Sequence, residues 1–212
     1  MTLAKVCGVT TREAVAAALD GGAAYLGFMV FPASPRHIAL AAAAALARPA
    51  RGRAKIVAVA VDPDDALADD IARVLAPDFI QLHGRETPSR AAELARRTGA
   101  GAIKAIAVAG AEDLDAARAY DGAVAHLMFD AKAPAGSPRP GGLGLTIDWG
   151  LLAGSRWAAP WFLAGGLDPW NAGDAVRLSG APMVDVSSGV ERGAGLKDPA
   201  LITAFLEAVR RA

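Results

Sequence analysis

Eight short apolar segments alternate along this chain with stretches of helical pattern, and this alternation restricts the fold more than any other feature. The segments are continuous runs rather than alternating ones, which is typical of parallel strands that helices cover on both faces. They span residues 4–7, 25–31, 56–61, 79–83, 102–108, 123–130, 161–164 and 184–187. The pattern therefore predicts an α/β protein built on a parallel sheet.

The expected helix starts repeat one kind of junction. Thr10 and Glu13 have the spacing of a capping box before the first helix. Four further starts place an N-cap residue before a proline at the first helical position. These are Asp62-Pro63, Thr87-Pro88, Asp168-Pro169 and Asp198-Pro199. Each lies between an apolar segment and the next helical pattern, as expected for a recurring strand-to-helix unit.

Eight such units are compatible with an open doubly wound sheet or with a closed (β/α)8 barrel. The repeats are nearly equal in length and the 212-residue sequence shows no break in composition. These features favour a TIM barrel that forms one domain over residues 1–212. The one long irregular segment, residues 131–145, holds three prolines and four glycines. Loops of this length inside a domain usually bind ligands or cover a site.

Charge and composition exclude several classes of partner. Lysine and arginine together number 22, as do aspartate and glutamate, so the formal net charge is zero. The chain therefore lacks the excess positive charge that binds nucleic acid or an anionic membrane. No apolar segment approaches the roughly 18 residues of a membrane span, and the N-terminus lacks a signal-peptide core. A single cysteine excludes internal disulfides. We therefore expect a cytoplasmic protein without nucleic-acid or membrane partners.

The candidate catalytic residues lie at the carboxyl ends of two predicted strands, where barrels carry their active sites. Cys7 ends the first apolar segment and Asp130 ends the sixth. A thiolate, favoured by the start of the following helix, can remove a proton, and a carboxylic acid can donate one. Each residue also has an ordinary alternative. Free cysteine is often a small buried apolar residue, and aspartate often caps a helix or a turn.

Three other polar residues are candidates for substrate contacts. Arg36 follows Ser34-Pro35 and could bind a carboxylate bidentately, or be a solvated loop residue. His83 ends the fourth segment and could bind substrate or orient a neighbouring loop. Asp185 lies within the apolar eighth segment, where a carboxylate must be paired or functional. It shares one face of that strand with Ser187.

Glycines cluster after the sixth, seventh and eighth segments. Backbone N–H groups of such loops bind phosphate in many barrels, although each cluster alone is compatible with an ordinary turn. The candidate phosphate-binding residues are Gly142, Gly144, Gly165, Gly166, Ser187, Ser188 and Gly189. The sequence has no metal-ligand spacing, no Gly-x-Gly-x-x-Gly turn after the first strand and no phosphate-binding P-loop motif. We therefore expect neither a metal nor a cofactor.

Motifs from end to end carry a resemblance to one family. They are Lys5-Val6-Cys7-Gly8-Val9-Thr10, Gly27-Phe28, Ser34-Pro35-Arg36, Gln81-Leu82-His83-Gly84, Phe129-Asp130, Gly141-Gly142-Leu143-Gly144 with Asp148-Trp149, Ala164-Gly165-Gly166-Leu167, and Asp185-Val186-Ser187-Ser188-Gly189-Val190-Glu191 with Lys197-Asp198. In this combination the chain resembles the phosphoribosylanthranilate isomerases of tryptophan biosynthesis. The resemblance implies a (β/α)8 barrel with Cys7 as general base, Asp130 as general acid and Arg36 as the ligand of the anthranilate carboxylate.

The resemblance also implies a reaction, the cofactor-independent Amadori rearrangement of N-(5-phosphoribosyl)anthranilate. The partner would be this phosphorylated small molecule, and we expect a monomer rather than a dimer. Two alternatives remain at this point. The sugar isomerase of the histidine pathway is similar, but it carries aspartate where Cys7 stands. A phosphate-binding barrel without catalysis is the other, and the presence of both Cys7 and Asp130 disfavours it.

Overall fold

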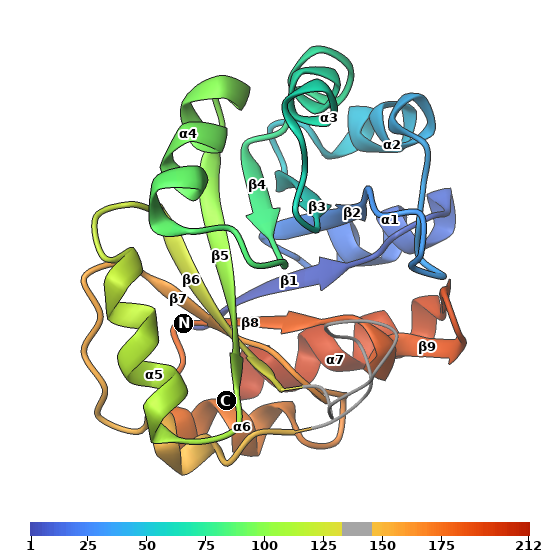
Figure 1. Cartoon of the computed structure of the whole chain (residues 1–212). Helices are drawn as coiled ribbons and strands as arrows, with labels where there is room; N and C mark the ends of the chain where they lie inside the picture. Colours follow the sequence, from blue (N-terminus) through green and yellow to red (C-terminus); the bar gives the residue numbers. More distant parts are fainter. Residues whose placement is uncertain (133–145) are drawn as a thin grey trace.

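Eight parallel strands close into a barrel in this computed structural model, which describes residues 1–132 and 146–212 (Figure 1). Each strand pairs with the next in sequence, and β8 pairs with β1. The strands are β1 (Leu3–Cys7), β2 (Tyr25–Met29), β3 (Lys55–Ala60), β4 (Phe79–Leu82), β5 (Gly101–Val108), β6 (His126–Ala131), β7 (Trp161–Leu163) and β8 (Met183–Val186). The closed barrel is confirmed, and the open doubly wound sheet is excluded.

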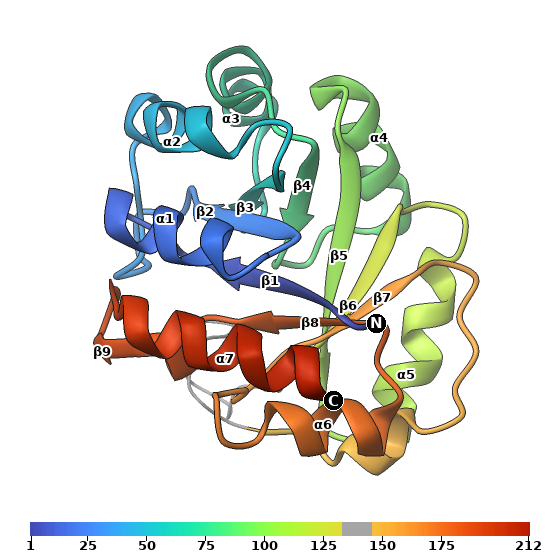
Figure 2. The same ribbon diagram turned by 180° about the vertical axis from the view of Figure 1, so that it is seen from behind.

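Helices surround the barrel and connect its strands (Figures 1 and 2). They are α1 (Arg12–Asp20), α2 (Leu40–Ala47), α3 (Asp65–Asp70), α4 (Pro88–Thr98), α5 (Ala111–Ala117), α6 (Ala172–Ser179) and α7 (Pro199–Arg211). Figure 2 shows α1 beside α7, which closes the ring on the outside of β1 and β8. An eighth helix was expected between β6 and β7. There the described residues form only a short 3-10 turn, Trp149–Leu152.

Two apolar clusters explain why the strand segments are continuously hydrophobic. Side chains alternate between the two faces of a strand. Those facing inward, such as Val57, Met128 and Phe162, fill the inside of the barrel. Those facing outward, such as Phe28 and Phe129, pack under the helices. Because both faces are buried, the strands lack polar alternation, as the sequence predicted.

The expected helix caps are partly confirmed. Thr87 and Asp198 cap α4 and α7, where their side-chain oxygens accept from the amides of Arg90 and Ala200 at 3.2 and 2.8 Å. The capping box at Thr10 and Glu13 is wrong by one residue. Helix α1 is capped instead by Thr11, whose hydroxyl accepts from the Ala14 amide at 3.2 Å.

Asp62 and Asp168 were expected to cap helices, and both expectations are wrong. Helix α3 is capped by Asp64, and α6 begins only at Ala172. Asp62 instead accepts from the amide of Arg85 at 2.7 Å, on the loop after the neighbouring strand. Asp168 accepts from the amides that follow it within its own loop. Each carboxylate therefore fixes a loop at the carboxyl end of a strand, and the helix begins further along.

Two strand boundaries and one hairpin also differ from expectation. Strand β2 ends at Met29 rather than at residue 31, and after the following loop the Ile38 amide donates to the Met29 carbonyl at 3.0 Å. Strand β6 begins at His126 rather than at residue 123. After β8 a small antiparallel hairpin forms from β9 (Glu191–Gly193) and β10 (Leu196–Lys197), which the sequence pattern did not predict.

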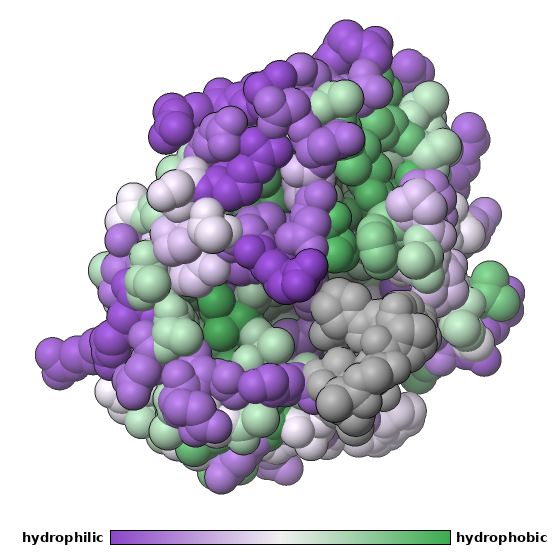
Figure 3. Space-filling model, viewed as in Figure 1, coloured by the Kyte–Doolittle hydropathy of each residue, from purple (hydrophilic) through white to green (hydrophobic). Residues whose placement is uncertain are grey.

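The outer surface is polar over some helices and apolar over others. Hydrophilic residues gather over α3 and α4 (Figure 3), where Arg97 pairs with Asp65 and Asp69 at 2.8 and 2.6 Å. Helix α2 is composed wholly of alanine and leucine. Among the described residues, no helix combines the length and the hydrophobicity that crossing a membrane requires.

Candidate active site

Cys7 is the last residue of β1. It belongs to the cluster inside the barrel, with Val57 and Met128, and is 4% exposed. Gly8 follows with a φ of +76°, a conformation that favours glycine and turns the chain away from the strand. Burial raises the pKa of the Cys7 thiol, whereas the ammonium of Lys5 lowers it. A thiolate at this position therefore depends on nearby cations to offset its burial.

Asp130 lies on β6, one residue before the strand ends. Asp130 is two residues after Met128 and therefore faces the inside of the barrel, as Met128 does. Asp130 and Cys7 thus both occupy inner positions at the carboxyl ends of their strands. Its Oδ1 accepts from the Ala131 amide at 2.9 Å, and its Oδ2 lies 3.2 Å from His83 Nε2. The Gln81 amide nitrogen, which only donates, lies 3.2 Å from His83 Nδ1. The His83 ring therefore bridges Gln81 and Asp130.

His83 follows β4 directly, and its loop is anchored from below by a buried ion pair. Lys104 on β5 contacts Glu86 at 2.8 Å, and both side chains are almost wholly buried. Lys104 Nζ also donates to the Gly84 carbonyl at 2.7 Å, and Glu86 accepts from the Gly84 amide at 3.1 Å. The hydrogen bonds of Lys104 and Glu86 go to each other and to this loop, so we infer that the pair fixes the loop that carries His83.

A second buried ion pair lies on the first and last strands of the barrel. Lys5 is 0% exposed, and its Nζ lies 2.8 Å from Asp185 Oδ1. The two residues stand opposite each other in the register of β1 and β8. Burial alone would lower the pKa of Lys5, but Asp185 raises it above the ordinary value, so the ammonium stays charged. A substrate contact by Asp185 would use its other oxygen, Oδ2.

Arg36 is buried rather than solvated, because the β9–β10 hairpin folds over it. Its Nε and Nη2 donate to the two oxygens of Glu191 at 2.7 and 3.0 Å. Lys197 Nζ contacts Glu191 Oε1 at 2.6 Å and donates to the Ser187 carbonyl at 2.9 Å. Burial alone would raise the pKa of Glu191, but the hydrogen bonds from Arg36 and Lys197 lower it. The outer Nη1–Nη2 edge of Arg36 remains for a ligand.

The loops after β7 and β8 lie against each other, and glycine permits the approach. A Cβ on Gly189 would lie 1.9 Å from the Leu167 carbonyl oxygen. Gly165 has a φ of +86°, and a Cβ there would lie 3.0 Å from Asp130 Oδ1. These two glycines are therefore required by packing in this fold, whether or not the loops also bind phosphate.

The candidate phosphate-binding residues fall into two groups. The half-buried ones on the adjoining loops are Gly165, Gly166, Ser187, Ser188 and Gly189. Gly142 and Gly144 lie outside the described residues, as does most of the long segment 131–145. The Ser187 hydroxyl donates to the Cys7 carbonyl at 3.2 Å, which ties the loop after β8 to the end of β1.

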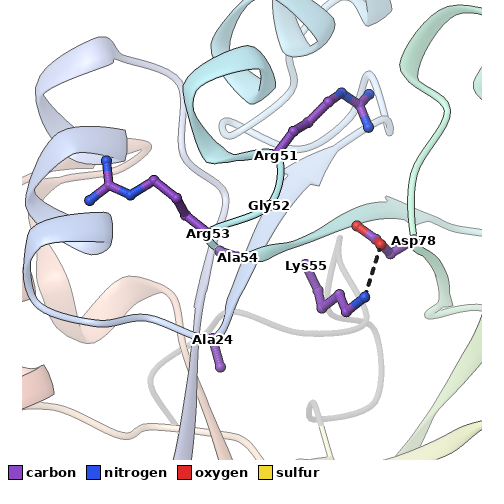
Figure 4. A pocket seen from close by; sticks show the side chains of 7 residues that line it. All are labelled: Ala24, Arg51, Gly52, Arg53, Ala54, Lys55 and Asp78. Carbon is purple, nitrogen blue, oxygen red and sulfur yellow. Dashed lines mark hydrogen bonds and ion pairs between the residues drawn. The ribbon is translucent and has the colours of Figure 1, made fainter.

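A different opening lies at the far end of the barrel, where β3 begins (Figure 4). Its lining includes Ala24, Arg51, Lys55 and Asp78, and Lys55 pairs with Asp78 at 3.3 Å. Strands begin at this end, whereas Cys7 and Asp130 lie where strands end. In TIM barrels the end where strands begin serves stability rather than chemistry. We assign no functional site to this opening.

Several residues of the candidate site were not singled out from the sequence. Lys5 and Lys197 are buried charged residues beside Cys7 or Arg36, and Glu191 has a buried side chain there. For Lys5 a signal existed, because a charge within an apolar strand must be paired, and its spacing of two places it on the same face as Cys7. Glu191 and Lys197 belong to motifs of the family resemblance, but no role was predicted for them, since the hairpin that carries them was not predicted.

The barrel and the thiol, carboxylate and guanidinium at one end of it define an enzyme of the TIM-barrel class that acts on a small molecule. The family described as N-(5'-phosphoribosyl)anthranilate (PRA) isomerase matches residues 4–208. The chain belongs to this family, the isomerases of tryptophan biosynthesis.

Individual relatives agree with this assignment. The N-(5'-phosphoribosyl)anthranilate isomerase of Caulobacter vibrioides is 60% identical over 99% of this chain and 96% of its own length. That of Caulobacter sp. K31 is 59% identical over the whole of both chains. The solved phosphoribosylanthranilate isomerase of Thermotoga maritima is 29% identical, covers all of both chains and has a TM-score of 0.85. The histidine-pathway isomerase and the non-catalytic barrel are therefore set aside.

Proposed function

We propose that this enzyme isomerises N-(5-phosphoribosyl)anthranilate to 1-(2-carboxyphenylamino)-1-deoxyribulose 5-phosphate, with Cys7 as general base and Asp130 as general acid and without a cofactor. The observation that carries the proposal is the placement of one thiol and one carboxylate at inner positions of the carboxyl ends of β1 and β6. One solved relative, 27% identical with a TM-score of 0.85, is complexed with a reduced form of this product.

The rearrangement needs two proton transfers at different atoms. Asp130, in its protonated form, donates to the ring oxygen as the bond from that oxygen to C1 breaks, which opens the sugar to a Schiff base. Cys7, as thiolate, removes the proton from C2, and the electron pair moves to give an enolamine. Tautomerisation of the enolamine gives the aminoketose, so no atom is gained or lost. A positioned acid or base typically contributes about 10²–10⁴-fold to such steps.

His83 supports the acid because it holds the Asp130 carboxyl from the adjacent side of the barrel at 3.2 Å. Arg36 supports binding because it is a fixed guanidinium beside the same strand end as Cys7. A Cβ on Gly8, the residue after Cys7, would lie 2.7 Å from Arg36 Cδ. A cation so close to the base suits an aromatic carboxylate attached through nitrogen to the reacting sugar carbon.

The direct test is a turnover assay with freshly made phosphoribosylanthranilate. The anthranilate-type fluorescence of the substrate should be lost when the purified protein is added. The rate should rise in proportion to enzyme concentration. Unchanged fluorescence with folded protein would overturn the proposed function.

Arg36→Ala should raise KM for phosphoribosylanthranilate, because a charge-assisted contact to the carboxylate is worth about 1.5–3 kcal/mol. Arg36→Lys should restore binding only in part, since lysine lacks the planar fork that also holds Glu191. Steady-state kinetics measure both effects. Arg85→Ala is the matched control, since Arg85 is exposed on a loop at the same end of the barrel. Wild-type kinetics in both Arg36 variants would exclude Arg36 as the carboxylate ligand.

Inorganic phosphate should compete with the substrate, because the loops after β7 and β8 offer backbone N–H groups to an anion. We expect the apparent KM to rise with phosphate concentration while kcat stays constant. A substrate analogue without the phosphate group should bind far more weakly. Sodium chloride at the same ionic strength is the control. If saturating phosphate leaves the apparent KM unchanged, the phosphate site is wrongly placed.

A further inference from the structure

Lys5 and Cys7 occupy alternate positions of β1 and project into the same part of the barrel. Lys5 is wholly buried and Cys7 nearly so. A lysine inside a barrel carries a high desolvation cost, which the contact with Asp185 at 2.8 Å offsets. A lysine–aspartate pair that served only packing could be replaced by apolar residues. Its place next to the thiol therefore calls for a functional explanation.

Gly27 on β2 supplies the space that the thiol and the ammonium share. It stands opposite Cys7 in the register of β1 and β2. A Cβ on Gly27 would lie 2.9 Å from Cys7 Sγ and 3.1 Å from Lys5 Nζ. Gly27 does not have a positive φ, so backbone conformation does not require glycine here. The requirement is steric, because any side chain would intrude on the sulfur and the ammonium at once.

The charges around Cys7 favour an anion at the sulfur. Three cations lie near it or near its neighbours, namely Lys5 on β1, Lys197 on β10 and Arg36 on the loop after β2. Two carboxylates face these cations, Asp185 on β8 and Glu191 on β9. With every group in its charged form this set carries one unbalanced positive charge. A thiolate at Cys7 would neutralise it.

We infer that Lys5 is a positioning residue for Cys7: anchored by Asp185 and seated in the space that Gly27 leaves open, its ammonium stabilises the Cys7 thiolate and directs the sulfur toward the substrate. This inference deepens the proposed function and rests on it for the role of the thiolate. The pKa of the Cys7 thiol is raised overall because of its burial, and the Lys5 ammonium is the largest influence in the opposite direction. That ammonium opposes the rise in pKa more strongly than the Asp185 carboxylate adds to it.

The test measures the thiol itself. Cys7 is the only cysteine of the chain, so alkylation by iodoacetamide as a function of pH reports its ionisation alone. The double variant Lys5→Met/Asp185→Asn removes the ammonium without leaving a buried carboxylate unpaired. We expect its midpoint for alkylation to move to higher pH. Alkylation at pH 8 should slow about tenfold for each pH unit of that movement.

Lys104→Met/Glu86→Gln is the matched control, because it neutralises a buried lysine–carboxylate pair that does not contact Cys7. Its alkylation midpoint should stay at the wild-type value. Gly27→Ala is a second, independent variant that keeps every charge. Its methyl group should separate Sγ from Nζ and also move the midpoint upward. Thermal unfolding identifies which variants are folded, and Gly27→Ala serves if the double variant is not.

The inference is overturned if a folded Lys5→Met/Asp185→Asn or Gly27→Ala variant is alkylated with the wild-type midpoint. Its failure is distinguishable from failure of the proposed function. Wild-type protein that turns over phosphoribosylanthranilate, and loses this activity in Cys7→Ala, keeps the proposed function even when the thiol ionises independently of Lys5. Wild-type protein without turnover removes the proposed function, whatever the alkylation shows.

Discussion

Replacing Cys7 by alanine should lower kcat by about 10²-fold or more, the usual loss when a general base is removed. The physical reason is the position of the thiol. It ends β1 inside the barrel mouth, and a methyl group there can neither accept the C2 proton nor pair with the Lys5 ammonium. Among the groups around it, Lys5, Lys197 and Arg36 are cations, and the carboxylates of Asp185 and Glu191 are paired with them.

Folding and product binding should survive this substitution, because alanine is smaller than cysteine and equally compatible with a buried apolar cluster. Calorimetric titration with the product and thermal unfolding provide the two controls. Substrate depletion followed by fluorescence provides the rate. A folded Cys7→Ala protein that keeps more than about a tenth of the wild-type kcat would contradict the assignment of Cys7 as base.

The architecture could be predicted from the sequence because the buried strands of a barrel are composed of apolar residues. The inward and outward faces are both covered, so segments such as residues 56–61 and 102–108 are uninterrupted apolar runs. Closure of β8 on β1 is a global property, yet the number and evenness of the units were enough to favour it over an open sheet.

Helix starts were harder to predict, for a local physical reason. Asp62, Asp64 and Asp168 all offer a carboxylate that can accept from nearby amides. The sequence does not say whether the recipient amide belongs to a helix or to a loop of the neighbouring strand. Competition between such local hydrogen bonds displaced two of the expected caps by two or more residues.

The candidate residues that the sequence marked most clearly were those that stood alone in an apolar context. Cys7, Asp130 and Asp185 satisfied that condition. Glu191 and Lys197 did not, because they sit in a polar segment, and Glu191 pairs with the distant Arg36. Periodicity and spacing carry no information about such contacts, since their partners are separated by 155 residues in sequence.

Asp130→Asn should lower turnover as strongly as Cys7→Ala, because an amide cannot supply a proton to the ring oxygen. The two side chains have nearly the same shape, so the exchange isolates the acid. The asparagine can still accept from the Ala131 amide through its oxygen and can meet His83 with its nitrogen, which keeps the local packing.

This near-identity of shape makes the result decisive between the two roles open to Asp130. If Asp130 only held a turn through the Ala131 amide, asparagine would serve almost as well and activity would persist. If it is the acid, kcat should fall by about 10²-fold or more while product binding and unfolding temperature stay near wild type.

The pH–rate profile of Asp130→Asn provides an independent test of the acid role. The reaction needs a base and an acid at the same time, so the wild-type profile should have a rising and a falling limb, and the falling limb should be absent from whatever activity Asp130→Asn retains. A folded Asp130→Asn enzyme with near-normal kcat and an unchanged pH profile would transfer the acid role to another group.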